Sequence, residues 1–130
     1  MLKVVLDTNV LVSALLNPGG KPAQILALIH GGHITLYYDS RIFLEYENVL
    51  SRKKFPFEAR DRELLLAAIS HRGMALVPAP SDMDFSDTQD KKFYEAAAEA
   101  GAYLITGNKK HFPDLSWIVT PADFLEEIRK

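Results

Sequence analysis

Two patterns of apolar residues alternate along the chain, one typical of buried β-strands and one typical of amphipathic helices. A short β-branched run such as Val4-Val5-Leu6 predicts a strand that is buried on both faces, as in the middle of a parallel sheet. Strands of this kind are expected near residues 4–6, 34–38, 74–77, 103–106 and 117–119. Helical spacing predicts helices near residues 10–16, 23–30, 41–52, 58–71 and 90–100 and after Thr120.

Glycine, proline and capping residues separate these elements. The cluster at residues 17–20 ends the first helix, and Pro22 suits the first turn of the second. Ser40 is expected to cap the helix over 41–52, and residues 78–89 form the longest irregular stretch. Strands that alternate with helices predict an α/β fold, here a three-layer α/β/α sandwich around a mostly parallel sheet of about five strands.

The composition is that of one ordinary globular domain. With 130 residues the chain is long enough for a real core, and we expect a single domain over residues 1–130. The formal net charge is −2, so a polyanion would have to be bound by local basic clusters or by metal ions. The absence of cysteine excludes disulfides, thiolate zinc sites and cysteine nucleophiles, and it fits a cytoplasmic protein. No apolar stretch is long enough for a signal peptide or a membrane span.

Acidic residues lie close behind the first three predicted strands. They are Asp7, Glu45, Glu47, Asp87 and Asp90. Open α/β sheets bind ligands at the carboxyl ends of their strands, so these side chains are expected to converge there. Carboxylates that converge repel one another unless a cation neutralises them, and oxygen ligands without cysteine favour Mg²⁺ or Mn²⁺.

Each of these acids also has a simpler interpretation. Asp7 is either a metal or catalytic carboxylate or the cap of the next helix, a role that Asn9 could also fill. Helical spacing alone does not separate Glu45 from the solvated margin of its helix. Asp90 falls on the buried face of its helix, whereas Asp87 suits a simple helix cap.

Taken together, four motifs of the chain resemble those of the PIN domain family. They are Asp7-Thr8-Asn9 after the first strand, the helix from Ser40 to Glu45, the helix that begins at Asp90, and the turn Thr106-Gly107-Asn108. Their order and spacing extend over nearly the whole chain and look most like the VapC-like toxins of toxin–antitoxin systems. The resemblance implies a Mg²⁺- or Mn²⁺-dependent endoribonuclease in which Asp7, Glu45 and Asp90 are catalytic residues and metal ligands.

The resemblance also implies how the substrate and the partners are bound. Asn9, Thr106, Asn108 and Lys109 would line the same pocket and contact the RNA. A small antitoxin protein would block the acidic cleft, and the chain would form a homodimer. The exposed lysines expected at residues 91–92 and 109–110 flank the site, where they could contact phosphates.

One position departs from the family pattern. His111 stands where many members carry a fourth acid, so the site is open to either one or two ions, with Asp87 or Asp114 as a possible source of the missing oxygen. Because of this departure, an alternative hypothesis stays open, in which the chain is a catalytically degenerate PIN domain that only binds RNA or a protein. A phosphatase with Asp7 as nucleophile is disfavoured, because that chemistry usually needs a second acid at the position of Asn9.

Overall fold

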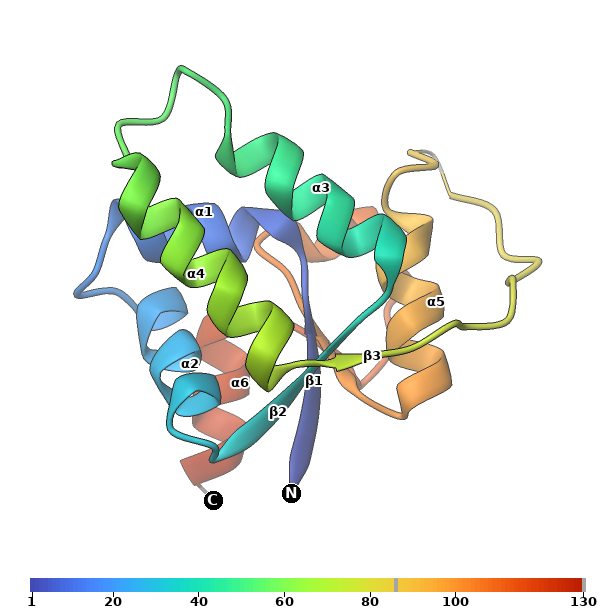
Figure 1. The fold of residues 1–130 in the computed structure, drawn as a ribbon. Helices are drawn as coiled ribbons and strands as arrows, with labels where there is room; N and C mark the ends of the chain where they lie inside the picture. Colours follow the sequence, from blue (N-terminus) through green and yellow to red (C-terminus); the bar gives the residue numbers. More distant parts are fainter. Residues whose placement is uncertain (86, 130) are drawn as a thin grey trace.

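A five-stranded parallel sheet forms the centre of the protein (Figure 1). The computed structural model describes residues 1–85 and 87–129. The strand order is β3-β2-β1-β4-β5, and every neighbouring pair is parallel. The strands are β1 (Leu2–Leu6), β2 (Ile34–Tyr38), β3 (Met74–Ala75), β4 (Tyr103–Ile105) and β5 (Ile118–Val119).

Helices connect the strands and cover the sheet on both sides. In Figure 1, α2 and α6 lie to the left of the central strands and α5 to the right, while α3 runs along the top and α4 descends from the upper left to the middle. The helices are α1 (Thr8–Leu16), α2 (Lys21–His30), α3 (Ser40–Leu50), α4 (Ala59–Arg72), α5 (Lys91–Ala100) and α6 (Pro121–Arg129), with a 3₁₀ helix, η1 (Lys109–His111). Within residues 1–85 and 87–129, no helix combines the length and apolar character needed to cross a membrane.

The middle strand β1 carries the centre of the core. Val4, Val5 and Leu6 are fully buried, as their uninterrupted apolar run predicts. The hydroxyl of the buried Tyr46 donates a 2.5 Å hydrogen bond to the backbone oxygen of Leu6, which ties α3 to the end of β1. The predicted fold class, an α/β sandwich around a mostly parallel five-stranded sheet, is confirmed.

Some element boundaries differ from those predicted. Asp39, not Ser40, caps α3, because its carboxylate accepts a 2.9 Å hydrogen bond from the backbone N–H of Ile42. The strand β3 ends at Ala75 rather than at Val77, although the backbone N–H of Leu76 still donates a 2.9 Å hydrogen bond to the backbone oxygen of Tyr38. The helix α1 begins directly after β1, earlier than its apolar spacing indicated. Both α1 and α3 therefore begin close to the carboxyl end of the sheet, directly after β1 and β2.

Candidate active site

Asp7 lies at the carboxyl end of β1 and is buried, with 7% of its surface exposed. Its backbone N–H donates a 2.9 Å hydrogen bond to the backbone oxygen of Ile105, which fixes it against β4. It occupies the N-cap position of α1, yet its side chain makes no capping hydrogen bond. Instead Oδ2 accepts hydrogen bonds from the Thr106 hydroxyl at 2.8 Å and from the Asn9 amide at 3.3 Å. The carboxylate therefore points into the site and does not cap the helix.

The turn after β4 is held against this carboxylate. The Thr106 hydroxyl donates to Asp7 and accepts a 2.9 Å hydrogen bond from the backbone N–H of Asn108. The Asn9 side-chain oxygen accepts a 3.0 Å hydrogen bond from the backbone N–H of Gly107. A Cβ atom at position 107 would approach that oxygen to 3.2 Å, so glycine permits the close contact. Asn9 and Thr106 thus orient Asp7 and the turn rather than facing solvent.

Glu45 is the acid of α3 that faces the site. Ile42 and Tyr46 bury one side of this helix, Glu45 lies at the margin that faces α5, and Glu47 is exposed. The carboxylate of Glu45 accepts a hydrogen bond from the Thr8 hydroxyl through Oε2. Its other oxygen, Oε1, lies 2.6 Å from the ammonium of Lys92. Both Glu45 oxygens are therefore directed at groups close to the end of β1.

Asp90 lies just before α5 with its side chain 15% exposed. It makes no capping hydrogen bond, and among the described residues its buried Oδ2 atom has no hydrogen-bond partner. This oxygen lies 3.6 Å from Nδ1 of His111, beyond hydrogen-bond distance. Asp87 instead makes a local turn, since its Oδ1 accepts a 2.9 Å hydrogen bond from the backbone N–H of Gln89. A buried carboxylate oxygen without a partner is the environment expected of a cation ligand.

The three carboxylates influence one another electrostatically. Burial raises the pKa of Asp7 from 3.8 to about 6, and the negative charges of Asp90 and Glu45 add to the rise, while the Thr106 hydrogen bond opposes it. Burial also raises the pKa of Asp90, together with repulsion from Asp87 and against the attraction of His111. Ionised carboxylates at this position are therefore costly, and a cation would relieve the cost.

The donor set fits a hard divalent ion in its chemistry, although the side chains are not gathered around one point. Among residues 1–85 and 87–129, no three acidic or histidine side chains lie close enough together to hold an ion. Oε1 of Glu45 faces Lys92, and Oδ2 of Asp90 faces His111. The buried, partnerless oxygen of Asp90 and the raised pKa of Asp7 are what a bound cation would satisfy.

The turn residues Asn108 and Lys109 are accessible, whereas the exposure predicted for Lys92 was wrong. Asn108 is exposed and Lys109 half-buried, so both remain accessible at the turn, while Asp114 is exposed on the loop that follows. Lys92 was expected among exposed lysines, but only 7% of its surface is exposed. A helical signal could have shown this, because Lys92 lies four residues before the fully buried Ala96 on the same face of α5.

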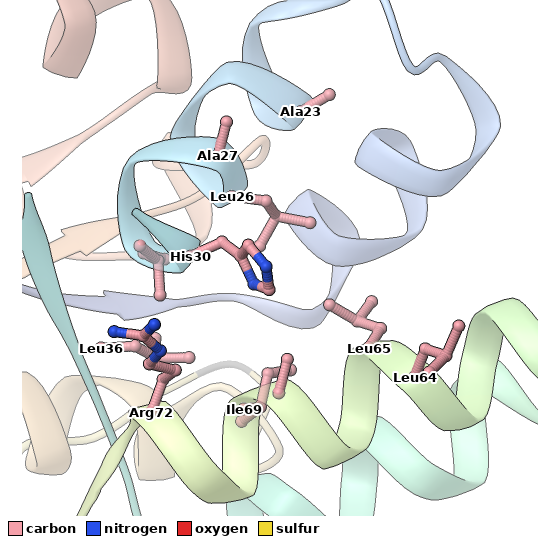
Figure 2. Close-up of a pocket in the computed structure, with 11 residues that line it drawn as sticks. Ala23, Leu26, Ala27, His30, Leu36, Leu64, Leu65, Ile69 and Arg72 are labelled. Carbon is pink, nitrogen blue, oxygen red and sulfur yellow. The ribbon is translucent and has the colours of Figure 1, made fainter. Parts of the chain in front are cut away.

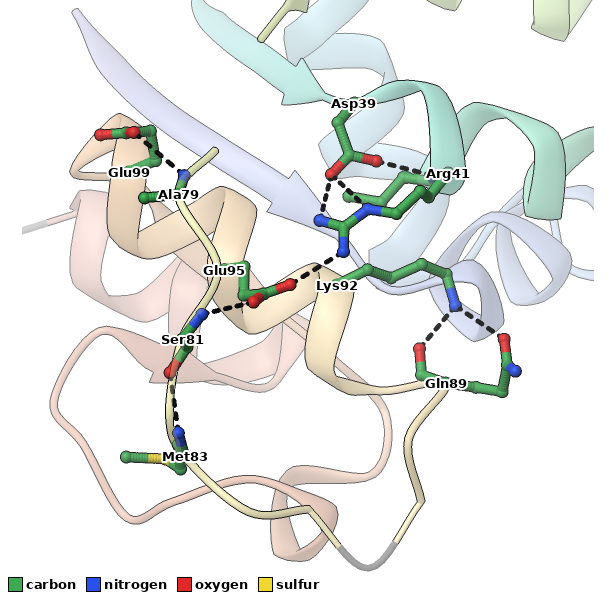
Figure 3. A network of polar contacts seen from close by, with 10 residues as sticks. Asp39, Arg41, Ala79, Ser81, Met83, Gln89, Lys92, Glu95 and Glu99 are labelled. Atoms are coloured by element: carbon green, nitrogen blue, oxygen red, sulfur yellow. Dashed lines mark hydrogen bonds and ion pairs between the residues drawn. The ribbon is translucent and has the colours of Figure 1, made fainter. Parts of the chain in front are cut away.

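A second buried network supports the site and was not predicted (Figure 3). Arg41 on α3 pairs with Asp39 at 2.6 Å and with Glu95 on α5 at 2.8 Å. The other oxygen of Glu95 accepts a 2.5 Å hydrogen bond from the backbone N–H of Ser81. These bonds lower the pKa of Glu95, while burial opposes them. The network joins α3, α5 and the irregular segment before Asp90, and so fixes the two helices that carry Glu45 and Asp90.

A different hollow lies between α2 and α4 (Figure 2). Its lining is almost entirely aliphatic, and the two basic side chains on it, His30 and Arg72, are not accompanied by a carboxylate. It therefore offers no carboxylate ligand to Mg²⁺ or Mn²⁺. The groove between α3 and α5, by contrast, is lined by Glu45, Asp90 and Lys92.

Comparisons with known proteins agree with this arrangement. A sequence profile of the PIN domain matches residues 3–110. The uncharacterized protein MJ1680 of Methanocaldococcus jannaschii is 33% identical over 144 residues, which cover 99% of this chain and 93% of that protein. The structure of VapBC2 from Rickettsia felis, bound to a DNA fragment from its promoter, contains a chain with a similar fold. The TM-score is 0.58 at 18% identity, over 92% of this chain and 97% of that chain.

Proposed function

Because the chain belongs to the PIN domain family, we propose that it is a metal-dependent ribonuclease. One observation carries the proposal. Asp7 follows β1 with its carboxylate buried, Glu45 lies on the side of α3 that faces α5, and Asp90 lies directly before α5 with a buried oxygen that has no hydrogen-bond partner among the described residues. The burial of Asp7 and the partnerless oxygen of Asp90 are destabilising without a cation, so they support a site selected for binding rather than for folding.

In the proposed mechanism Asp7, Glu45 and Asp90 hold Mg²⁺ or Mn²⁺. The ion would supply positive charge to the phosphodiester and make water a better nucleophile at neutral pH. The chain contributes orientation: Thr106 and Asn9 hold the Asp7 carboxylate in one rotamer through Oδ2. Asn108 and Lys109, accessible at the turn, are proposed to contact the RNA backbone, where a lysine acts as a point charge toward phosphate.

We further propose that the protein is the toxin of a toxin–antitoxin pair. The similar fold of a chain in the VapBC2 complex supports a small antitoxin partner, which would cover the acidic groove. A homodimer, a single domain over residues 1–130 and a cytoplasmic location are parts of the same proposal. They can be tested by the molar mass of the purified chain and by co-purification with the product of a neighbouring small gene.

The direct test is cleavage of an end-labelled mixed-sequence RNA by the purified chain, with Mn²⁺ or Mg²⁺ and with chelator. We expect cleavage that requires metal and that disappears in Asp7→Asn. Asp61→Asn, which removes an exposed carboxylate from α4, is the matched control and should cleave like the wild type. Full activity of Asp7→Asn would refute the site.

A catalytically degenerate, binding-only PIN domain is the second candidate. It is favoured by His111 beside Asp90, where many family members have a fourth acid, and by the ion pair that already occupies Glu45. This candidate predicts that RNA binds equally well with and without divalent metal and is never cleaved. The same labelled RNA, followed by both gel shift and cleavage, distinguishes the two functions.

A further inference from the structure

The ammonium group of Lys92 is buried inside the acidic site. It lies 2.6 Å from Oε1 of Glu45 and donates hydrogen bonds of 2.5 Å and 3.2 Å to the backbone and side-chain oxygens of Gln89. Figure 3 shows the two bonds to Gln89. A lysine ammonium has three N–H donors, so these three contacts use all of them. Lys92 therefore has no free donor for a phosphate and acts on the site through its charge.

The place of Lys92 in its helix argues against a purely helix-stabilising role. It lies in the first turn of α5, where the helix dipole disfavours a positive charge. Burial of an ammonium is also unfavourable unless anions compensate it. Its compensation here comes from Glu45, with Asp90 close enough for the charge of Lys92 to lower the pKa of Asp90. The neighbouring carboxylates therefore compensate the unfavourable burial of the Lys92 ammonium group.

The charges of the site balance with one divalent ion. When ionised, Asp7, Glu45 and Asp90 carry three negative charges, and Lys92 carries one positive charge. The remaining two negative charges are neutralised by a single Mg²⁺ or Mn²⁺. A second ion would then add excess positive charge beside a buried ammonium, which is unfavourable at this separation. His111, beside Asp90, adds no anionic ligand that would offset it.

We propose that Lys92 is a built-in counter-charge that restricts this site to one divalent ion and stabilises the carboxylates when no ion is bound. The inference rests on the proposed function, in that it takes Asp7, Glu45 and Asp90 as the metal ligands. Lys92 acts through Glu45 and is a positioning residue.

The test counts ions on the purified full chain after chelation, with Mn²⁺ alone as the probe. Binding is followed by calorimetry and by EPR of free Mn²⁺, and the metal-free melting temperature is measured in parallel. Lys92→Met removes the charge and keeps much of the volume. Lys91→Met is the matched control, because Lys91 precedes Lys92 in the same turn of α5 and its side chain makes no hydrogen bond or ion pair with the described residues. The double variant Glu45→Gln, Lys92→Met removes both partners of the ion pair.

We expect one Mn²⁺ per wild-type chain. Lys92→Met should bind Mn²⁺ at least about tenfold more tightly or take up a second ion, because a repulsive buried charge has been removed. Its metal-free melting temperature should fall, and the double variant should recover part of that loss. Lys91→Met should match the wild type in both measurements. If Lys92→Met does not fold without metal, Mn²⁺ should restore its folding.

Several results would overturn the inference. They are unchanged affinity and stoichiometry in Lys92→Met, an equal change in Lys91→Met, failure of Mn²⁺ to fold an unfolded Lys92→Met, or two ions on the wild type. A wild-type chain that binds one ion but cleaves no RNA would refute the nuclease and leave the counter-charge standing. A wild-type chain that cleaves RNA with two ions bound would refute the counter-charge alone.

Discussion

The groove between α3 and α5 buries charged side chains, whereas the hollow between α2 and α4 is lined by apolar side chains. In the groove, Glu45, Asp90 and Lys92 are wholly or partly withdrawn from water, and so is Asp7 at the carboxyl end of β1. In the hollow, the lining is aliphatic, with Ile69 of α4 as a buried contact to the sheet. Burial of charge in the groove lowers the free energy of unfolding, whereas burial of the apolar side chains that line the hollow raises it. Substitutions in the two regions should therefore separate activity from stability.

The largest difference is expected for Asp90→Asn in the groove. It removes the charge of a proposed ligand, and activity should fall by more than about a hundredfold, since even outer-shell partners of a metal contribute up to that factor. Asp87→Asn is the neighbouring control, because Asp87 bonds only within its own turn. Cleavage rates of the two variants at saturating Mn²⁺ provide the measurement. Equal losses in both would mean that the general negative charge of the segment matters rather than ligation by Asp90.

In the hollow, Ile69→Ala should have the reverse effect. Ile69 is 3% exposed, and removal of its buried carbons should lower the free energy of unfolding by about 3 to 4 kcal/mol. Mn²⁺ affinity and cleavage per folded molecule should not change. Urea unfolding and cleavage are measured on the same preparation, with Ile69→Val as a milder control that should lose about 1 kcal/mol. A loss of metal affinity in Ile69→Ala would show that the two regions are coupled.

The difference between buried charges and buried apolar residues also determines how well each region could be predicted from the sequence. The strand Val4-Val5-Leu6 and the acid behind it were predicted because a buried parallel strand has an unmistakable apolar pattern. Glu45 needed the family resemblance, because a charge at a helix margin has the same spacing whether it faces a site or solvent. The structure directs Glu45 at Lys92 and Thr8, and its role as a metal ligand stays a prediction.

Other features could not be obtained from local patterns. Asp39 and Ser40 are both good cap residues, and only the backbone path after β2 decides between them. Lys92 was taken for a surface charge and Glu95 was not singled out, because each is paired with a partner distant in sequence, Glu45 and Arg41 respectively. Burial of a charge is a property of the pair, and pairing across elements leaves no signal along one segment. Lys92 and Glu95 line the groove, whereas the hollow is lined mainly by apolar residues of α2 and α4.

The cost of charge in the groove predicts that Asp7→Asn stabilises the metal-free protein while it abolishes activity. The pKa of Asp7 is raised from 3.8 to about 6 in the folded state, so folding favours its protonated form. That contribution to stability is complete below about pH 4 and is lost as the pH rises through about 6. Above that range Asp7→Asn should be more stable than the wild type by up to about 3 kcal/mol, for a shift of about two units.

The measurement is urea unfolding of both proteins with chelator from pH 4 to pH 8. The stability difference should be small at pH 4 and should grow toward pH 8, since the other titrating groups are common to both chains. Excess Mg²⁺ should reverse the order, because only the wild type has the complete set of ligands to bind it. A difference that does not change with pH would refute the raised pKa of Asp7.

The smallest effect is expected at His111, which marks the outer limit of the groove. The His111 side chain is 48% exposed and lies 3.6 Å from Asp90, so its influence is partly screened by solvent. His111→Asp adds an oxygen ligand and a negative charge, and Mn²⁺ affinity should rise by about threefold, as expected for a half-exposed charge. His111→Asn, which adds neither charge nor a carboxylate, is the control and should bind Mn²⁺ like the wild type. A second tightly bound ion in His111→Asp with Lys92 intact would mean that the missing acid, and not the buried lysine, sets the number of ions. Because Lys92 is buried and His111 is half-exposed, we expect the lysine to have the greater influence on ion number.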